Sequence, residues 1–308
     1  MADANAEAAT VLLTGASGQA GFELCRALAP LGRVLAPARA ELDLADAAAV
    51  DAWLERHTPD LIVNAAAYTA VDKAEDEPAL ARRLNAELPA QLAAYCARHG
   101  KWLVHYSSDY VYSGAGNTPW AEDAATAPVN SYGETKRDGD AAVVQSGSAH
   151  LVFRTSWVYS APGKNFVNTM LRLGAERESL AVVADQIGAP TPARLIAQVT
   201  ALALAPWPRT GQAAIPRGVY HLAPRGEASW WDVARATFVE AARLGMPLAI
   251  TPEAVAPIAT EDYPTPARRP RNSRLNVKKL EHALSITLPD WRAQLALTLQ
   301  ETRSYHAA

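Results

Sequence analysis

An apolar strand that runs into a glycine-rich turn and then into a helix opens this chain, and that order restricts its fold more than any other feature. Val11-Leu12-Leu13 is the strand candidate, and Thr14-Gly15-Ala-Ser-Gly18-Gln-Ala-Gly21 follows it, ahead of a helical pattern from Phe22. Glycines at this spacing let the chain turn sharply and bring backbone N–H groups at a helix start close to a pyrophosphate. The pattern predicts a dinucleotide-binding turn, and a turn that only packs helix against strand is the alternative.

Strand and helix candidates alternate through the first half of the chain. The further strands are expected at 33–36, 61–63, 102–106 and 151–153, and the helices at 47–57, 79–99 (broken only at Pro89) and 132–144. Such alternation indicates right-handed βαβ units around a parallel sheet. We therefore predict an α/β fold whose first domain, residues 1–160, is a Rossmann-like doubly wound parallel sheet that binds a dinucleotide.

The regular alternation ends near residue 160, where proline becomes frequent. The expected elements are a strand at 218–222, a helix at 229–244 with Ser229 as N-cap, a loop at 263–274 and a helix at 291–305. We predict a smaller α+β substrate-binding domain, mainly residues 161–189 and 226–308, with segments near 190–225 returning to the first domain. Because ligands bind beyond the carboxyl ends of strands in open α/β sheets, the smaller domain would close over that edge.

Composition and charge exclude several classes of function. The 308 residues carry 29 Lys and Arg against 32 Asp and Glu, and a net charge of −3 creates no overall attraction to nucleic acid or anionic lipid. Two cysteines cannot form a disulfide framework or a four-cysteine zinc site. No apolar run approaches the roughly 18 residues of a membrane span, and the acidic first residues lack the basic start of a signal peptide. We expect a soluble, cytoplasmic protein with no metal, nucleic-acid or membrane partner.

A tyrosine and a lysine four residues apart form the clearest catalytic candidate. Tyr132 and Lys136 would be stacked on one face of a helix, and a nearby ammonium lowers the pKa of a phenol from its usual value near 10. Tyr132 would then serve as a general acid or base. A hydroxyl from Ser107-Ser108, at the end of the preceding strand, would orient a carbonyl oxygen. The spacing alone also fits a surface Tyr–Lys pair.

The end of the second strand is where a dinucleotide-binding fold contacts the ribose of its cofactor. Arg39 lies there and would hold a 2′-phosphate, while Glu41 and Asp43 are the nearest acids. This arrangement favours NADPH over NADH. A solvated surface charge is the alternative interpretation of Arg39.

Six stretches of the chain resemble the extended short-chain dehydrogenase/reductase family. They are Asn64–Glu75, Ser107–Tyr112, Ser131–Lys136, Arg154–Tyr159, Asp185–Thr191 and Tyr263–Ser273. The resemblance covers most of the chain and implies NAD(P)H-dependent reduction of the C4 ketone of dTDP-4-dehydro-L-rhamnose to dTDP-L-rhamnose. The alternatives are another nucleotide-sugar 4-ketoreductase, an epimerase or dehydratase on the same scaffold, or a non-catalytic regulatory subunit.

The same resemblance implies roles for individual residues. Ser108 would be the catalytic hydroxyl, Tyr132 the proton donor, and Lys136 the residue that tunes Tyr132 and holds the nicotinamide ribose. The expected cofactor-binding residues are Gly15, Ser17, Gly18, Gln19, Arg39, Asp43, Leu44, Ala65, Ala66, Ala67, Tyr132 and Lys136. The expected substrate-binding residues are Tyr68, Val71, Asp109, Trp157 and Arg269.

Two arginine positions bear on partners. Arg269, in the proline-rich loop at 263–274, is the candidate to clamp the substrate diphosphate, since guanidinium matches phosphate geometry; a solvated basic loop is the alternative. Some members of the family carry a glutamate just after the Gly-Ala-Pro-Thr stretch, linked to a magnesium-mediated dimer, whereas this chain has Arg194 there. Hard cations prefer oxygen ligands. We therefore expect no structural Mg²⁺, and a monomer or a homodimer without a metal bridge.

Overall fold

The apolar runs of the first half form one parallel sheet in the computed structural model, which describes residues 9–307. Its strands are β1 (Thr10–Thr14), β2 (Arg33–Leu35), β3 (Leu61–Asn64), β4 (Trp102–Ser108), β5 (Ala149–Thr155) and β10 (Gly218–His221). They pair in the order β10-β5-β4-β3-β1-β2, so the direction of winding reverses beside β1. Residues 1–8, which include the acidic start on which we based the prediction of no signal peptide, lie outside the described part.

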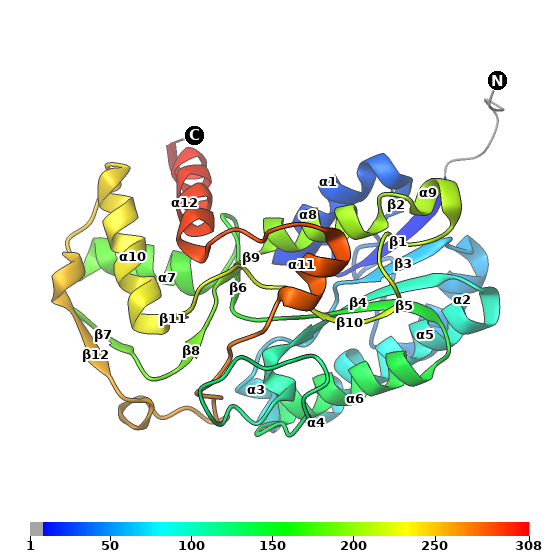
Figure 1. Cartoon of the computed structure of the whole chain (residues 1–308), viewed down its shortest axis with the longest axis horizontal. Helices are drawn as coiled ribbons and strands as arrows, with labels where there is room; N and C mark the ends of the chain where they lie inside the picture. The colour runs from blue at the N-terminus through cyan, green and yellow to red at the C-terminus, as the bar shows by residue number, and fades with distance from the viewer. Residues whose placement is uncertain (1–8, 308) are drawn as a thin grey trace.

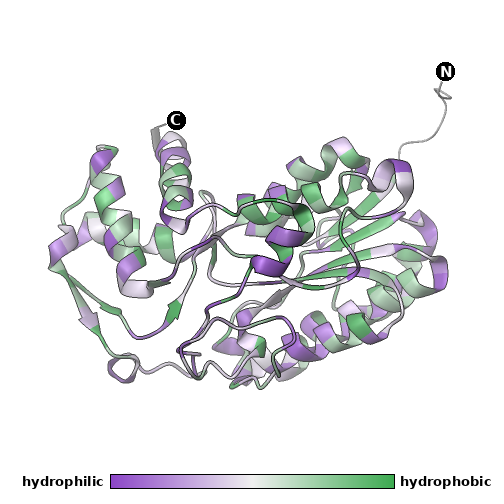
Figure 2. Cartoon of the chain, in the orientation of Figure 1, coloured by the Kyte–Doolittle hydropathy of each residue, from purple (hydrophilic) through white to green (hydrophobic). Residues whose placement is uncertain are grey.

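Helices cover both faces of this sheet, which confirms the predicted doubly wound α/β fold (Figure 1). The helices on one face are α1 (Gln19–Leu28), α8 (Ala193–Leu204) and α11 (Lys278–Leu284), and those on the other are α2 (Ala47–His57), α5 (Leu88–His99) and α6 (Ser131–Gln145). Alternate residues of β1 show why, since Val11 and Leu13 belong to the first core and Leu12 to the second. Figure 2 shows the strands between the helices as mainly hydrophobic.

The predicted helix at 79–99 is interrupted, but not at Pro89. α4 (Pro78–Arg82) passes into a π-helical turn at Arg83–Glu87, and α5 then begins with Pro89 in its first turn. A proline ring inside an α-helix collides with the carbonyl four residues earlier, here that of Asn85. The wider π-turn ahead of Pro89 places Asn85 differently, so the helix changes geometry before the proline.

The second half of the chain builds a smaller unit at the other end of the molecule (left in Figure 1). Its main elements are α7 (Phe166–Glu176), α10 (Trp230–Arg243), α12 (Trp291–Ala307) and a parallel pair of β7 (Leu180–Val183) with β12 (Val255–Ile258). Its core contains Val167, Val233 and Leu295. Ser229 caps α10 as predicted, with Asp232 completing a capping box. The expected loop at 263–274 is also confirmed.

The remaining elements of the chain are short. They are α3 (Lys73–Asp76), α9 (Trp207–Thr210), β6 (Val158–Tyr159), β8 (Ile187–Gly188), β9 (Thr191–Pro192), β11 (Ala228–Ser229) and 3₁₀ turns at Ala29–Leu31, Asp109–Val111, Pro252–Ala254 and Thr260–Asp262. β6 pairs with β9, and β8 pairs with β11. Within residues 9–307, no helix is both long enough and apolar enough for a membrane crossing.

The division of the chain into two domains remains our proposal, and three segments bear on it. α8 packs on α1, and β10 extends the large sheet, so residues near 190–225 return to the first unit. α11, which lies in the range that we assigned mainly to the second domain, also packs against the large sheet through Leu280.

Candidate active site

The glycine-rich turn lies directly against the segment that follows β3. Gly15 has a φ of +71°, and a Cβ there would come within 2.6 Å of the backbone N of Ala66. A Cβ on Gly21 would meet the carbonyl oxygen of Gly15 at 2.1 Å. Gly18 is the N-cap of α1 and supplies no capping side chain, so N–H groups of the first helical turn remain available to an anion. The turn thus combines close packing with an anion-accepting helix start.

A buried polar chain ties together the carboxyl ends of three neighbouring strands. The hydroxyl of Thr14 donates to Oδ1 of Asn64 at 2.6 Å, and Nδ2 of Asn64 lies 3.1 Å from Nδ1 of His105. Burial, helped by the charge of Lys136, holds the pKa of His105 well below its usual value. The neutral ring therefore accepts from Asn64 at Nδ1. The N–H groups of Ala65 and Ala66 donate to Thr14, so these two residues lie beside the glycine turn.

Asn85, which sequence reasoning did not identify, fastens the predicted substrate segment to the predicted catalytic helix. Its Oδ1 accepts from the backbone N–H of Tyr68 at 2.8 Å, and its Nδ2 donates to the carbonyl of Tyr68 at 3.0 Å and to the hydroxyl of Thr135 at 3.2 Å. Thr135 precedes Lys136 on α6, and Asn85 is fully buried. A lone asparagine in an amphipathic pattern gives no sign of this role, because the role arises from the π-turn.

Ser108 and Tyr132 meet at the carboxyl end of β4. The Ser108 hydroxyl donates to Oδ1 of Asp109 at 3.0 Å and accepts from the N–H of Tyr110 at 3.2 Å. The Ser108 hydroxyl also lies close enough to the phenol of Tyr132 to lower the pKa of that phenol. The Tyr110 ring packs edge-on against Tyr132, with 5.4 Å between ring centroids. A Cβ on Gly133 would come within 2.3 Å of the Tyr110 carbonyl oxygen, so only glycine allows α6 to begin this close to the 3₁₀ turn that follows β4.

Lys136 is buried beneath this end of β4. Only 1% of it is exposed, and its Nζ donates to the carbonyl oxygen of Tyr106 at 2.6 Å. Burial lowers the pKa of Lys136 to about 8, against the opposing pull of Asp140. The lysine is therefore an ammonium at neutral pH, held by the strand rather than exposed to solvent.

The pKa of Tyr132 moves in the opposite direction from our prediction. Burial raises it, the nearby hydroxyl of Ser108 lowers it, and the charges of Asp109 and Asp140 raise it further. The helical spacing to Lys136 had predicted a net lowering, but burial is the larger effect. A phenol with a raised pKa keeps its proton at neutral pH, which suits a proton donor.

Asp109 and Arg269 present polar atoms that the described residues leave unpaired. Asp109 is 1% exposed, and burial raises its pKa to about 6, although the nearby hydroxyls of Ser273 and Ser108 lower it. Oδ2 of Asp109, Oγ of Ser273 and Nη1 of Arg269 are buried without a hydrogen-bond partner among the described residues. Nη2 of Arg269 donates to Asp72 at 2.7 Å. Buried polar atoms usually find partners, so these three atoms mark positions that a polar ligand would satisfy.

Trp157 adopts a backbone conformation that is unusual for its residue type. Its φ is +49°, and its ring stacks on Trp230 with centroids 3.8 Å apart and planes 15° apart. A Cβ on Gly188 would come within 2.9 Å of the Trp157 ring. Left-handed backbone at a bulky residue costs about 1–3 kcal/mol and is concentrated at functional sites. The stack and the open space at Gly188 together hold Trp157 in that position.

The remaining predicted residues are distributed along the same edge of the sheet or beyond it. Ser17 is exposed in the glycine turn, and Leu44 packs with the core that contains α2. Arg39 follows β2 with a side chain that is 85% exposed, 4.0 Å from Asp43. The Gln19 side chain instead accepts from Ser160 and donates to the Val158 carbonyl. Tyr68 donates from its phenol to Glu77, and Val71 is half-buried.

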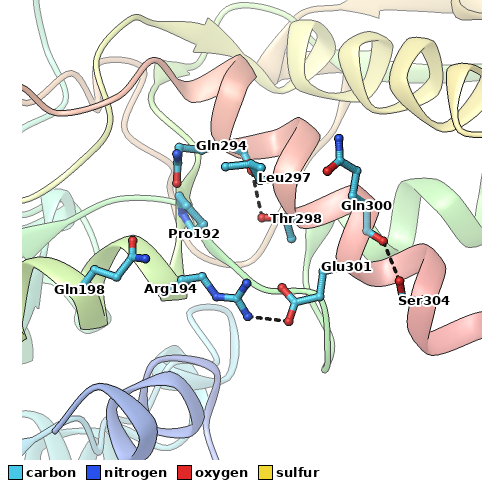
Figure 3. A pocket seen from close by; sticks show the side chains of 9 residues that line it. All are labelled: Pro192, Arg194, Gln198, Gln294, Leu297, Thr298, Gln300, Glu301 and Ser304. Atoms are coloured by element: carbon cyan, nitrogen blue, oxygen red, sulfur yellow. Dashed lines mark hydrogen bonds and ion pairs between the residues drawn. The ribbon is translucent and has the colours of Figure 1, made fainter. Parts of the chain in front are cut away.

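A separate cavity of about 630 Å³ lies away from these residues (Figure 3). It is lined by Pro192, Arg194, Gln198, Gln294, Leu297, Thr298, Gln300, Glu301 and Ser304. None of the predicted catalytic, cofactor-binding or substrate-binding residues lines it. It is therefore not the candidate active site.

Comparison with known proteins shows which family this chain resembles. Residues 9–304 match the family model described as RmlD substrate binding domain. A dTDP-4-dehydrorhamnose reductase of Shigella flexneri is 47% identical, over 94% of this chain and 97% of its own length. Another from Burkholderia thailandensis is 47% identical, over 96% of this chain and 99% of its own length. The crystal structure of dTDP-4-dehydrorhamnose reductase from Bacillus anthracis in complex with NADP is similar with a TM-score of 0.83 and 32% identity, covering 95% of this chain and 99% of that chain.

Proposed function

This chain belongs to the dTDP-4-dehydrorhamnose reductase family of the extended short-chain dehydrogenases/reductases, and from that premise we infer that it is an NAD(P)-dependent oxidoreductase. It reduces the C4 ketone of dTDP-4-dehydro-L-rhamnose to dTDP-L-rhamnose, in dTDP-L-rhamnose biosynthesis. The observation that carries this function is the position of the Ser108 hydroxyl beside the protonated phenol of Tyr132. It lies at the carboxyl edge of the sheet that also carries the glycine turn.

We propose that NADPH is the reductant, as the complex of the Bacillus anthracis relative with NADP supports. The first turn of α1, which has no side-chain cap, fits a pyrophosphate, and Ala65 and Ala66 lie beside the glycine turn that precedes it. The exposed Arg39 fits a 2′-phosphate. When bound, the reduced dinucleotide supplies the hydride that the ketone carbon receives.

The side chains of this protein then provide the proton and hold the oxygen. The hydroxyls of Ser108 and Tyr132 bind the ketone oxygen, and Tyr132 transfers its phenolic proton to the oxygen as negative charge develops there. The raised pKa of the buried phenol keeps that proton in place beforehand. The buried ammonium of Lys136 stabilises the negative charge that the transfer leaves on the phenol.

For the substrate, we propose that the unpaired atoms described above face its polar groups. Oδ2 of Asp109 would accept from a sugar hydroxyl, and Nη1 of Arg269 would donate to the diphosphate. Trp157 would line the sugar site, with Tyr68 and Val71 beside the nucleotide. The partners are thus a nucleotide sugar and the dinucleotide. A monomer or a homodimer remains a prediction.

An assay with the purified protein tests the reaction. We expect one NADPH to be oxidised for each dTDP-4-dehydro-L-rhamnose consumed. The loss of NADPH absorbance measures this oxidation. An epimerase would return the hydride without net consumption, and a regulatory subunit would consume none. Either result would contradict the proposal.

A substitution at Tyr132 tests its role. Tyr132→Phe should bind NADPH as the parent does and lower turnover by about two to four orders of magnitude, because the proton donor is lost. Tyr305→Phe is a matched control, since Tyr305 is 53% exposed on α12, and it should react at the parent rate. Parent-like turnover of Tyr132→Phe would refute the assignment.

A further inference from the structure

Three charged side chains meet where α1, α8 and α12 come together, outside the catalytic site. Nη2 of Arg194 lies 2.5 Å from Oε1 of Glu301 and 3.4 Å from Oε1 of Glu23. Nε of Arg194 also lies 3.4 Å from Oε2 of Glu23. Figure 3 shows the guanidinium of Arg194 directed at Glu301 beside the cavity between α8 and α12.

This cluster links the helix of the glycine turn to the last helix of the smaller unit. Glu23 lies one turn after Gln19 on α1, so the two residues share one face. The amide oxygen of Gln19 accepts from Ser160 and from Asn165, the N-cap of α7, each at 2.9 Å. One face of α1 therefore contacts the smaller unit twice, once at Gln19 and once through Arg194.

A cation is required at this place. The side chain of Glu23 is only 7% exposed, and a buried carboxylate is unfavourable unless it is paired. Glu301, 22% exposed, brings a second negative charge to the same point. Burial lowers the pKa of Arg194, but the hydrogen bonds with Glu301 and Glu23 outweigh it and raise that pKa above the usual value. The guanidinium thus stays charged between the two carboxylates.

A magnesium ion, which some members of the family bind, does not fit the cluster of Arg194, Glu23 and Glu301. A guanidinium carries only hydrogen-bond donors, whereas Mg²⁺ needs oxygen ligands in near-octahedral geometry. Arg194 occupies the point on which Glu23 and Glu301 converge. In the part of the chain that the structure describes, no group of three or more His, Cys, Asp or Glu side chains could hold a metal.

We propose that Arg194 is a built-in replacement for a divalent cation and makes the junction of α1, α8 and α12 independent of metal. The two carboxylates keep the positions that a third, at residue 194, would complete into an oxygen site. The folding stability of the parent protein is therefore insensitive to Mg²⁺ and to chelators. Arg194→Glu, in contrast, converts the junction into a site for a divalent cation.

Thermal unfolding of the full chain tests the proposal, in EDTA, Mg²⁺ or Mn²⁺ with ionic strength matched by NaCl. We expect one Tm for the parent in all three media. Arg194→Glu should have a lower Tm in EDTA, because three carboxylates then repel one another, and each cation should restore it in a saturable way. Arg194→Gln, the matched control, should have a lowered Tm that no cation restores. Titration with Mn²⁺ should give one site on Arg194→Glu and none on the parent.

Three results would overturn the proposal: a saturable rise of the parent Tm with Mg²⁺, an unchanged Tm of Arg194→Gln, or folded Arg194→Glu that binds no Mn²⁺. If Arg194→Glu does not fold, a double-mutant cycle of Arg194→Gln, Glu301→Gln and the double variant still tests the proposal. We expect the losses in the unfolding equilibrium constant to be non-additive by several-fold. Additive losses would refute the link between Arg194 and Glu301.

Discussion

Replacing Asp109 by asparagine should make the protein more stable while it impairs the reaction. Asp109 is 1% exposed, its Oδ1 accepts from Ser108 at 3.0 Å, and its Oδ2 has no partner among the described residues. Asparagine has nearly the same shape and keeps the acceptor for Ser108. It removes the buried charge and supplies an N–H that can donate to the unpaired hydroxyl of Ser273.

The magnitude follows from the pKa of this carboxyl group. Burial raises the pKa of Asp109 from 3.8 to about 6, so the folded state binds the proton more tightly than the unfolded state. The stability that this group contributes is complete below about pH 4 and is lost as pH rises through about 6. Two pKa units correspond to about 3 kcal/mol. For a chain of this length, that free energy is roughly 5 °C in Tm.

Thermal unfolding of the parent and of Asp109→Asn, between about pH 4 and pH 8, measures this difference. The increase in Tm of the variant over the parent should be largest above about pH 6 and should vanish toward pH 4. The variant should also reduce the ketone more slowly than the parent does. Asp123 is exposed, so Asp123→Asn should follow the parent at every pH. A gain that does not change with pH, or a loss of stability at the alkaline end, would show that the charge of Asp109 is not the cause.

Two further predictions concern the same site. The value of kcat/KM should fall as pH rises through about 8, because the ammonium of Lys136 is lost above its lowered pKa. Lys136→Arg, which stays charged, should remove this decline. A decline of the parent only near pH 10 would contradict the explanation. Gly188→Ala places a methyl group within 2.9 Å of the Trp157 ring. This variant should raise KM for the nucleotide sugar by about tenfold and leave the Kd for NADPH unchanged. An equal weakening of the binding of both ligands would indicate general unfolding instead.

The strands of the large sheet were predictable because helices bury both faces of each strand, so each reads as an apolar run. The predicted lengths fell short at the functional ends. β4 was expected at 102–106 and continues to Ser108, and β5 was expected at 151–153 and continues to Thr155. Ser107 and Ser108 pair with Arg154 and Thr155. A hydrophobic pattern detects the buried part of a strand and misses the polar end that carries the chemistry.

Two helices of the second half, α7 and α8, were not predicted, for two different reasons. α8 packs on both α1 and the sheet, and most of its residues are buried, so the exposed stripe that marks an amphipathic helix is narrow. It also begins after Pro192, without a side-chain cap. α7, in contrast, has a local signal that we did not use, since Asn165 accepts from the N–H of Asn168 as its N-cap.

The candidate site shows where spacing along a helix stops being informative. The interval between Tyr132 and Lys136 predicts a shared helix face, and both residues lie on α6. It does not reveal that Nζ of Lys136 is directed at the Tyr106 carbonyl, or that Asn85 holds the neighbouring Thr135. Those contacts depend on β4 and on the π-turn, which are remote in sequence.

Burial explains the electrostatics of the site better than the Tyr–Lys pair does. It raises the pKa of Tyr132 and of Asp109 and lowers that of Lys136, so in each case the charged form is disfavoured. In the proposed mechanism, Tyr132 therefore keeps its proton while a ketone is bound and releases it when an alkoxide forms. In the proposed mechanism, Lys136 acts after the proton has moved, because only then does a phenolate exist for its ammonium to stabilise. On this reasoning, a charge-conserving change at Lys136 alters the pH dependence of the reaction. It has a smaller effect on the protonation of Tyr132 before the reaction.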